Sequence, residues 1–253
     1  MNEKLSRRKL ITKGLAATAG LSGLAVAARL AAKFGLIPPD CRGLYGAAAT
    51  LTYAAHRLLT RHSLAREFPR SMISKAPFAN GKPPEIEAFK RLRAGGFADW
   101  RLAIDGMVAH PGSFSISDLK SLPSRSQITQ VSCEEGWSYI AEWIGTPLSH
   151  FLEMAGILPQ AKFVVYYSIE AEWWDSIDMG DALHPQTLLT YGFNGGDLPV
   201  GFGGPLRMRV ARQLGYKNVK YINHLTVTDN LRAFGNGLGS APPEGGYSWY
   251  AGI

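Results

Sequence analysis

The residues best suited to chemistry stand around Cys133, in the stretch VSCEEGW. Glu134 and Glu135 follow this cysteine directly, and the chain has one other cysteine, Cys41. Four roles are open to Cys133: a disulfide with Cys41, an inert buried thiol, a metal ligand or a catalytic nucleophile. A nucleophile needs a positive setting that lowers the thiol pKa, whereas two adjacent carboxylates raise it. Because a soft metal removes the thiol proton regardless, the charges favour a metal ligand.

The chain offers few further ligands for a metal at Cys133. Its six histidines, at positions 56, 62, 110, 150, 184 and 224, form no H-x-x-x-H pair, so a zinc site has weak support. A cofactor would then have to supply the remaining ligands. The sequence also has no C-x-x-C-H haem motif and no iron–sulfur spacing. Redox chemistry would therefore need another protein to carry electrons.

Five cations fall within one short stretch and could bind an anionic group of a cofactor. They are Arg207, Arg209, Arg212, Lys217 and Lys220. Arginine suits phosphate because its planar guanidinium donates two parallel hydrogen bonds. Glycines at positions 201, 203 and 204 precede the cations and allow the backbone to approach a ligand closely. The alternative interpretation is a solvated basic face of a strand.

The pattern along the chain predicts an α+β domain with a mixed sheet. Apolar residues at helical spacing predict helices over residues 44–66 and 147–157, and Ser117 is a candidate N-cap for a short helix. Alternation from Trp100 and the turn AHPG predict a hairpin. Further strand-like stretches cover residues 126–132, 162–170, 187–195, 206–211 and 220–229. Cys133 thus follows directly on a strand.

The N-terminal segment has the composition of an export signal. Its charges are Lys4, Arg7, Arg8, Lys9 and Lys13, opposed by Glu3. Ser6-Arg7-Arg8 before an apolar run resembles a bacterial twin-arginine signal, and Ala25-Val26-Ala27 is a candidate cleavage site. Arg29 interrupts the apolar run and makes it a poor spanning helix, with an uncleaved membrane anchor as the alternative. We therefore expect twin-arginine export to the periplasm, or tethering to the inner membrane.

Composition describes a folded globular protein of 253 residues, 46% of them hydrophobic. The formal net charge is +7, and removing residues 1–28, with five positive charges and one negative, leaves +3. A net charge of +3 makes the remaining chain only mildly basic, which does not indicate nucleic-acid binding. We expect three parts: residues 1–32 as the signal or anchor, residues 33–66 as a linker and helical arm, and residues 67–253 as the catalytic domain.

Several motifs together resemble the sulfite oxidase superfamily of molybdenum enzymes. Cys133 opens the stretch CEEGWSYIAEWIGTPL, and later come GFNGG, GGPLR, GYKNVKY and the C-terminal GGYSWYAGI. The similarity runs from about residue 65 to residue 253, and five motifs in one order are specific. The resemblance implies a sulfite-oxidase-type molybdopterin-binding fold, α+β with a mixed sheet and here with an N-terminal helical arm. It also implies one mononuclear molybdenum bound by molybdopterin.

The resemblance assigns roles to single residues. Cys133 would be the protein thiolate on molybdenum, beside two sulfurs of the cofactor. Arg207 would bind the pterin or its phosphate, and Ser168 matches a hydroxyl position that lines the pterin. The remaining cofactor contacts would be Asn218, Val219 and Lys220, together with Phe78, Asn80 and Gly81 of the loop PFANG.

At one position the chain departs from the family pattern. Relatives usually have Asn or His just before the glycine of the G-x-PLR motif, and this chain has Phe202. A phenylalanine side chain cannot donate a hydrogen bond. Either a neighbouring residue replaces that contact, or the affinity for the cofactor is reduced.

The expected chemistry is two-electron transfer of an oxygen atom, and the glutamates after Cys133 bear on the substrate. They would repel the sulfite dianion. The pattern looks closer to the bacterial reductase branch, which includes periplasmic methionine-sulfoxide reductases. We therefore expect reduction of S- or N-oxides, with Glu135 as a proton source. Tryptophans 137, 143, 173 and 174 would be either apolar walls or plain core.

Two alternatives and two further expectations accompany this hypothesis. Sulfite oxidation is the first alternative, and a non-catalytic protein of the same fold that has lost its cofactor is the second. The phenylalanine at position 202 is the feature that suggests the second alternative, and the intact Cys133 argues against it, because a protein without cofactor would not need this thiol. We expect an external electron partner, either a membrane cytochrome b or a soluble cytochrome c. We also expect a monomer, since the dimerisation domain of the larger sulfite oxidases is missing from the sequence.

Overall fold

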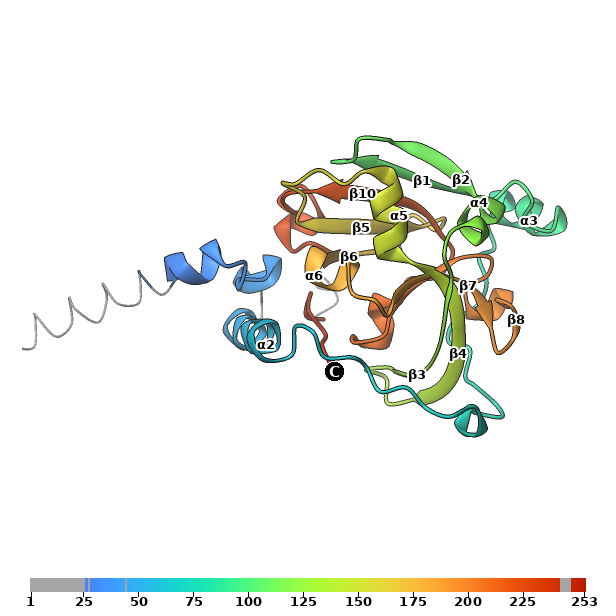
Figure 1. Ribbon diagram of the computed structural model, residues 1–253, viewed down its shortest axis with the longest axis horizontal. Helices are drawn as coiled ribbons and strands as arrows, with labels where there is room; N and C mark the ends of the chain where they lie inside the picture. The colour runs from blue at the N-terminus through green and yellow to red at the C-terminus, as the bar shows by residue number, and fades with distance from the viewer. Residues whose placement is uncertain (1–25, 27, 44, 242–246) are drawn as a thin grey trace, which may run out of the picture.

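The computed structural model describes residues 26, 28–43, 45–241 and 247–253 (Figure 1). The predicted twin-arginine motif at residues 6–8 lies outside the described residues, as do Ala25 and Ala27 of the candidate cleavage site. Within the described part of the chain, no helix has both the length and the apolar character needed to cross a membrane.

One five-stranded sheet is mixed. Its strand order is β2 (Gly112–Ser115), β1 (Arg101–Gly106), β10 (Ile222–Thr228), β5 (Phe163–Ser168) and β6 (Trp174–Asp178). The β1–β10 pair is parallel, whereas β1–β2, β10–β5 and β5–β6 are antiparallel. The α+β class with a mixed sheet is therefore confirmed, and the hairpin predicted around the turn AHPG forms as β1 and β2.

A second sheet is antiparallel and carries most of the site. Its strands are β3 (Arg125–Ser132), β4 (Ser138–Pro147), β7 (Thr187–Phe193) and β8 (Gly196–Asp197), with β9 (Arg207–Val210) also paired to β7. Every residue of β7 is buried because this strand lies between β4 and the pair β8 and β9. The long β3–β4 hairpin curves below β7 in Figure 1.

The helices are short and lie around the two sheets. They are α2 (Gly46–Leu59), α3 (Glu87–Ala94), α4 (Ile116–Ser121), α5 (Leu148–Ala155) and α6 (Met179–Ala182). The predicted helix at residues 147–157 is confirmed as α5, since Leu148, Phe151, Leu152 and Ala155 line one fully buried face. Gly156 ends α5 in the left-handed conformation, where glycine has no steric cost. Short 3-10 turns complete the chain: η1 (Pro39–Arg42), η2 (Arg70–Met72), η3 (Val200–Phe202), η4 (Gly215–Lys217) and η5 (Gly235–Gly237).

Two predicted boundaries are wrong, and both have a local cause. The helix expected over residues 44–66 ends at Leu59, where the carbonyls of Thr60 and Arg61 accept hydrogen bonds from Arg212 instead of from the next helical turn. The N-cap of α4 is Ser115 and not Ser117. Ser115 forms a capping box with Asp118, which satisfies two backbone N–H groups at once.

The helix α2 is attached to the domain through a buried ionic cluster. Arg57 lies 2.7 Å from both Asp178 and Asp181, and the Tyr53 hydroxyl donates to Asp178 at 2.6 Å. Burial disfavours the charge on Arg57, but the two carboxylates outweigh this effect and raise its pKa. The N-terminal arm therefore has a defined orientation on the domain.

Candidate functional site

Cys133 lies in the tight turn that joins β3 to β4. Its backbone N–H donates to the Trp137 carbonyl at 3.0 Å, and its carbonyl accepts from Gly136 at 3.1 Å. Gly136 has a φ of +90°, a conformation that L side chains rarely adopt. The glycine that follows the two glutamates thus closes the turn and holds the thiol at the end of a rigid hairpin.

The Cys133 sulfur is surrounded by carboxylates and by a glycine. Its Sγ lies 3.2 Å from Glu134 Oε2 and 3.7 Å from Glu135 Oε2. Partial burial, with added effects of the two glutamates, raises the pKa of the thiol to about 12. Such a thiol is a poor nucleophile, in agreement with the prediction from the sequence. Both cysteines are free thiols, so Cys133 is not in a disulfide with Cys41.

Glu135 is held in place by two N–H donors from different parts of the chain. Its Oε2 accepts from Trp137 Nε1 at 2.7 Å and from Asn80 Nδ2 at 2.9 Å. The Phe78 ring packs against the Trp137 indole, with centroids 5.3 Å apart. The loop PFANG is thereby brought next to the turn that holds Cys133. Gly81 has open space around it, and its φ of +71° lets the chain turn away.

Lys220 connects the same loop to the glycine-rich segment before β9. Its Nζ donates to the carbonyl of Asn80 and, at 2.6 Å, to the carbonyl of Gly201. Burial, followed by the nearby charge of Arg207, lowers the pKa of Lys220 to about 8, and Glu170 opposes this shift. A side chain at Gly203 would come within 2.9 Å of Lys220, so only glycine leaves room for this lysine.

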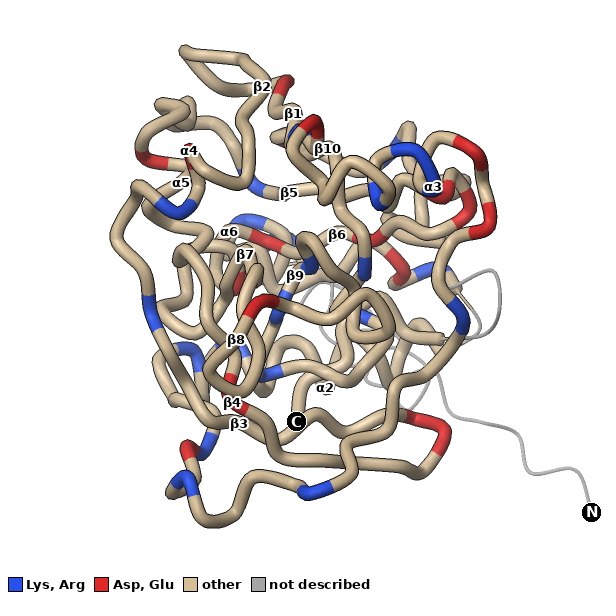
Figure 2. Tube along the Cα trace, turned by 90° about the vertical axis from the view of Figure 1, so that its right-hand side faces the viewer, with Lys and Arg blue, Asp and Glu red and all other residues tan. Residues whose placement is uncertain are grey.

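Arg207 and Arg209 are buried in β9 and face the indole of Trp143. Their guanidinium carbons lie 5.1 and 5.4 Å from the centre of that ring. Arg207 donates to the carbonyls of Phe202 at 2.7 Å and Asn218 at 2.8 Å. Burial, followed by the charge of Arg207, lowers the pKa of Arg209 to about 9. Figure 2 shows Lys and Arg positions gathered around β9 in the middle of the molecule.

These three cations have no carboxylate partner. Among the described residues, no Asp or Glu oxygen lies within 4.0 Å of the charged nitrogens of Arg207, Arg209 or Lys220. The Nε atoms of both arginines are also buried without a hydrogen-bond acceptor. Buried charges in proteins are normally paired, because an isolated charge is costly to remove from water. The arrangement therefore fits an anionic ligand.

The structure separates the five basic residues of this stretch into two groups. Lys217 is fully buried and forms an ion pair with Asp175, and its Nζ also donates to the Ser176 carbonyl at 2.8 Å. Arg212 donates to the carbonyls that follow α2 and lies 4.0 Å from Asp181. The prediction that all five cations serve one anionic group is thus wrong for Lys217 and Arg212. Both already have partners in the fold.

The other predicted contacts form the frame of the site. The Asn218 side chain accepts from the Val210 N–H at 2.8 Å and from Arg209 at 3.0 Å, so it fixes β9 to the turn η4. Val219 is buried, and its carbonyl accepts from Met208. Ser168 ends β5 opposite Ile222, two residues beyond Lys220. Its hydroxyl accepts from the Glu170 N–H at 3.1 Å.

Phe202 contributes a carbonyl and an aromatic ring to this region. The carbonyl accepts from Arg207, and the ring stacks on Phe193 at 4.5 Å and meets the edge of Tyr139 at 5.9 Å. The phenylalanine therefore packs in the small core of the second sheet. Four tryptophans were expected to form either apolar walls or core, and of these only Trp137 contacts a residue beside Cys133, namely Glu135. Trp143 is fully buried, Trp173 is largely exposed, and Trp174 packs on Tyr167.

Two residues of the site were not predicted as site residues. Gly215 lies against Cys133, since a Cβ at this glycine would meet Sγ at 3.3 Å. Tyr139 is buried beside Arg207. Burial raises the pKa of its hydroxyl, and the arginine opposes this shift. Gly215 could have been found from its place at the start of the motif GYKNVKY, and Tyr139 from its place within the stretch CEEGWSYIAEWIGTPL.

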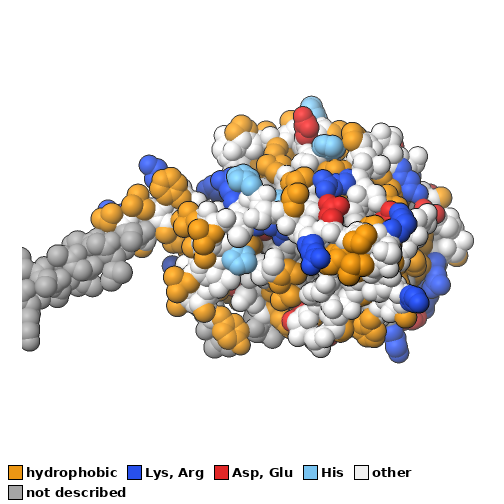
Figure 3. All heavy atoms as spheres, turned by 60° about the horizontal axis from the view of Figure 1, so that its bottom comes forward, with side chains coloured by type: hydrophobic (Ala, Val, Ile, Leu, Met, Phe, Trp, Pro, Cys, Tyr) orange, Lys and Arg blue, Asp and Glu red, His pale blue; other side chains and the backbone are white. Residues whose placement is uncertain are grey.

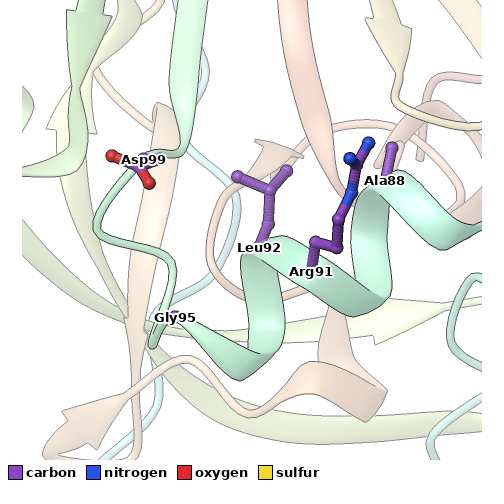
Figure 4. A pocket seen from close by; sticks show the side chains of 5 residues that line it. All are labelled: Ala88, Arg91, Leu92, Gly95 and Asp99. Carbon is purple, nitrogen blue, oxygen red and sulfur yellow. The ribbon is translucent and has the colours of Figure 1, made fainter.

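A surface hollow of about 310 Å³ lies elsewhere, beside α3. It is lined by Ala88, Arg91, Leu92, Gly95 and Asp99 (Figure 4). It contains none of the residues around Cys133 or the three unpaired cations. A cavity alone does not identify the site, which is defined by the thiol and the buried charges.

Molybdopterin fits the residues around Cys133. Its phosphate is anionic and would compensate Arg207, Arg209 and Lys220, and the thiol would provide a soft ligand for molybdenum. Gly203 and Gly215 leave room that side chains would fill. The fit involves residues from the loop at 78–81, the β3–β4 turn, β9 and the segment between η4 and β10.

The chain belongs to the family described as the oxidoreductase molybdopterin binding domain. Residues 90–233, more than half of the chain, match it. The resemblance to the sulfite oxidase superfamily is therefore confirmed, and the protein is a molybdenum cofactor-dependent oxidoreductase by family.

Curated relatives agree with this family. A protein of Azospira oryzae, named as a protein-methionine-sulfoxide reductase subunit, YedZ1, is 34% identical over 77% of this chain and 70% of its own length. The catalytic subunit MsrP of a protein-methionine-sulfoxide reductase from Xanthomonas axonopodis pv. citri is 30% identical over 61% of this chain. The match spans about half (52%) of that MsrP.

A solved structure supports the fold. The sulfane dehydrogenase SoxCD from Paracoccus pantotrophus aligns with a TM-score of 0.52 and 22% identity. The alignment covers 67% of this chain and 46% of that one. At this identity the likeness establishes the fold alone. The predicted sulfite-oxidase-type fold is thus confirmed.

Proposed function

We propose that this protein is an exported molybdenum enzyme that reduces S-oxides, with the Cys133 thiolate as the protein ligand of the metal. One observation carries the proposal: a thiol on a rigid turn shares its site with two buried arginines and one half-buried lysine that have no carboxylate partner among the described residues. When bound, the cofactor supplies a metal that accepts an oxygen atom from a substrate in a two-electron change. The protein residues bind the cofactor, select the substrate and provide protons.

The carboxylates beside Cys133 favour a neutral substrate. Glu134 and Glu135 both lie within 4 Å of the sulfur that would hold the metal. Both carboxylates are exposed, and two negative charges beside the thiol repel a sulfite dianion and leave a neutral sulfoxide unaffected. We therefore assign the substrate to the sulfoxides, the class that the names of the YedZ1 and MsrP relatives also indicate.

Reduction of a sulfoxide consumes two protons as well as two electrons. The sulfur–oxygen bond breaks, the sulfoxide becomes a sulfide, and its oxygen leaves with the two protons as one molecule of water. Glu135 is positioned to deliver a proton, because Trp137 and Asn80 hold its Oε2 and leave Oε1 as the oxygen that can carry one. The electrons come from an external carrier, for which a cytochrome of b or c type is the proposed class. Two relatives are named as subunits, which supports a second protein.

The unpaired cations argue against a protein that has lost its cofactor. A fold that binds no anion gains nothing from burying Arg207 and Arg209 beside the half-buried Lys220, and substitution by apolar residues would relieve their mutual repulsion. Phe202 does not remove the cofactor-binding frame, since its carbonyl still orients Arg207. The unpaired cations and the retained Phe202 carbonyl together support an intact cofactor-binding site.

Elemental analysis of purified protein tests the proposal directly. Protein from a host that makes the cofactor is expected to hold about one molybdenum per chain and to reduce a methionine sulfoxide with a reduced artificial donor. The Cys133→Ser variant should lose the activity, whereas Cys41→Ser should retain both metal and activity. Absence of molybdenum from the wild-type protein would disprove the proposal that this protein is a molybdenum enzyme. Full activity of the Cys133→Ser variant would disprove the proposal that Cys133 is the protein ligand of the metal.

The proposed export route needs a separate test, because its motif lies outside the described residues. Replacement of Arg7 and Arg8 by lysine preserves charge but removes the paired guanidinium groups. We expect the variant to remain in the cytoplasmic fraction while the wild-type protein reaches the periplasm. Equal export of both would contradict a twin-arginine route.

A further inference from the structure

The helix α2 turns its arginine toward the protein and its leucines toward solvent. Arg57 is buried in the ionic cluster with Asp178 and Asp181. Leu51, Leu58 and Leu59 are 73%, 67% and 82% exposed. The helix also buries Ala49 and Tyr53, so it is apolar toward both the core and the solvent, whereas a surface helix normally has a polar outer face. Figure 3 shows hydrophobic side chains gathered over this arm of the molecule.

The exposed side of α2 carries no charge at all. We call it the leucine face, and its residues are Ala47, Ala48, Leu51, Thr52, Ala55, Leu58 and Leu59. The leucines are seven and eight positions apart, so they lie on one side of the helix. Contiguous apolar surface of this kind on a folded protein marks an interaction site.

The orientation of α2 is fixed, so the helix cannot roll to bury its leucines. Arg57 makes hydrogen bonds of 2.8 Å to both oxygens of Asp178 and bonds of 2.7 and 3.3 Å to Asp181. His56 contacts the Tyr250 hydroxyl at 3.2 Å on the same side. Rotation about the helix axis would leave two buried carboxylates without their cation, which is strongly unfavourable.

The exposed charges that lie nearest to the leucine face in sequence are all positive up to residue 66, and the exposed carboxylate that follows, Glu67, is paired with Arg125. From residue 28 to residue 66, the exposed charged side chains among the described residues are Arg29, Lys33, Arg42, Arg61 and Arg66. The acidic residue in this segment, Asp40, is buried and accepts a hydrogen bond from the Trp249 backbone at 2.7 Å. The face is thus an uncharged apolar strip between two groups of cations. Two such arms would repel each other.

We propose that the leucine face binds to the surface of an anionic lipid bilayer. The leucines would enter the boundary between head groups and acyl chains, and the flanking arginines and lysine would contact the lipid phosphates. Helices of this kind lie in the plane of the membrane interface, and polybasic neighbours add attraction to anionic lipids. The binding requires no spanning segment. It holds the catalytic domain at a membrane independently of the reaction that the domain performs.

A fluorescent residue in the leucine face tests this proposal on the full chain. A dansyl-bearing amino acid replaces Leu58, and in a control protein it replaces Ile86, an exposed residue at the start of α3. With vesicles of phosphatidylcholine and phosphatidylglycerol, we expect a blue shift of the emission at position 58 and none at position 86. Pure phosphatidylcholine vesicles should give a much smaller shift. The readout is local, so binding through residues 1–25 does not mimic it.

Two variants make the test specific. Leu51→Gln/Leu59→Gln removes apolar area, and Arg61→Gln/Arg66→Gln removes charge; each should reduce the vesicle affinity at position 58 at least tenfold. Neither touches Arg57, and the thermal midpoint should stay unchanged. Absence of a shift at position 58, or equal shifts at positions 58 and 86, overturns the proposal. So does a shift that appears without vesicles and grows with protein concentration, which would assign the face to a second copy.

Discussion

Gly215 packs directly against Cys133, and a Cβ added to it would lie 3.3 Å from the sulfur and 3.4 Å from the cysteine Cα. This contact brings the turn η4 against the β3–β4 hairpin, although 82 positions separate the two residues in sequence. The distances are slightly too short for a side chain. A substitution must therefore displace the thiol or the turn by a few tenths of an ångström.

Gly215→Ala is expected to lower catalysis without unfolding the protein. Displacement of the metal ligand misaligns the reacting atoms, and such errors reduce kcat by roughly 10- to 100-fold. The measurement is molybdenum content, kcat and thermal midpoint of the same preparation. Gly196→Ala, at an exposed glycine of β8, serves as the control variant, since a Cβ there meets only the Phe193 carbonyl oxygen at 4.0 Å and the backbone φ is not in the left-handed region. Unchanged kcat and full metal content in Gly215→Ala would show that the contact is not critical.

Glu135→Gln is expected to retain the cofactor and lose activity. The amide oxygen of glutamine still accepts from Trp137 and Asn80, but the side chain no longer supplies a proton. Removal of a general acid reduces kcat by about 10²- to 10⁴-fold. Glu134→Gln is the matched control, because it removes one charge next to Cys133 but keeps the Glu135 contacts. Equal losses in both variants would assign the effect to charge and not to proton transfer.

The three unpaired cations predict that simple anions stabilise protein prepared without cofactor. Inorganic phosphate should raise the thermal midpoint, and at 100 times its Kd the gain is about 2.7 kcal/mol. Arg207→Met and Lys220→Met should abolish this gain, whereas Lys120→Met, an exposed lysine near Asp197, should not. A phosphate effect that survives both the Arg207 and the Lys220 substitution would place the anion elsewhere.

The lowered pKa of Lys220, about 8, makes the stability of cofactor-free protein depend on pH. Between about pH 8 and its ordinary pKa of 10.5, the unfolded chain binds a proton that the folded chain has released. The lysine therefore lowers stability below pH 8, and this effect disappears as the pH rises through that window. Chemical denaturation of wild type and Lys220→Gln checks this. Their difference in unfolding free energy should shift in favour of the wild type as the pH rises, and a constant difference would contradict the assignment.

The ionic cluster under α2 predicts a large effect of a single change. Arg57→Met leaves Asp178 and Asp181 buried without a cation, and breaking such a pair costs about 3–5 kcal/mol. Lys90→Met, which removes an exposed pair with Glu87, should cost at most about 0.5 kcal/mol. Urea denaturation measures both. A loss of similar size in the two variants would mean that α2 contributes little to the stability of the domain.

Local pattern was sufficient for most of the elements. The period of the apolar residues in α5 and the alternation in β1 can be seen without a structure, because burial of one face imposes that period. The helix at residues 44–66 was predicted too long, because its end depends on Arg212, a residue far away in the sequence. Ser115 and Ser117 are both plausible caps in isolation. The Asp118 side chain reaches Ser115 and selects it.

The sequence by itself determined that Cys133 follows a strand, that two carboxylates stand beside it and that five cations share one stretch. These are facts of composition and order, whereas the molybdenum family came from the resemblance of five motifs in one order. Only the tertiary structure decided which cations are free for a ligand. Lys217 meets Asp175 and Arg212 meets two carbonyls, while Arg207, Arg209 and Lys220 meet no carboxylate among the described residues. Pairing depends on distances between segments far apart in sequence, and these distances exist only in the fold.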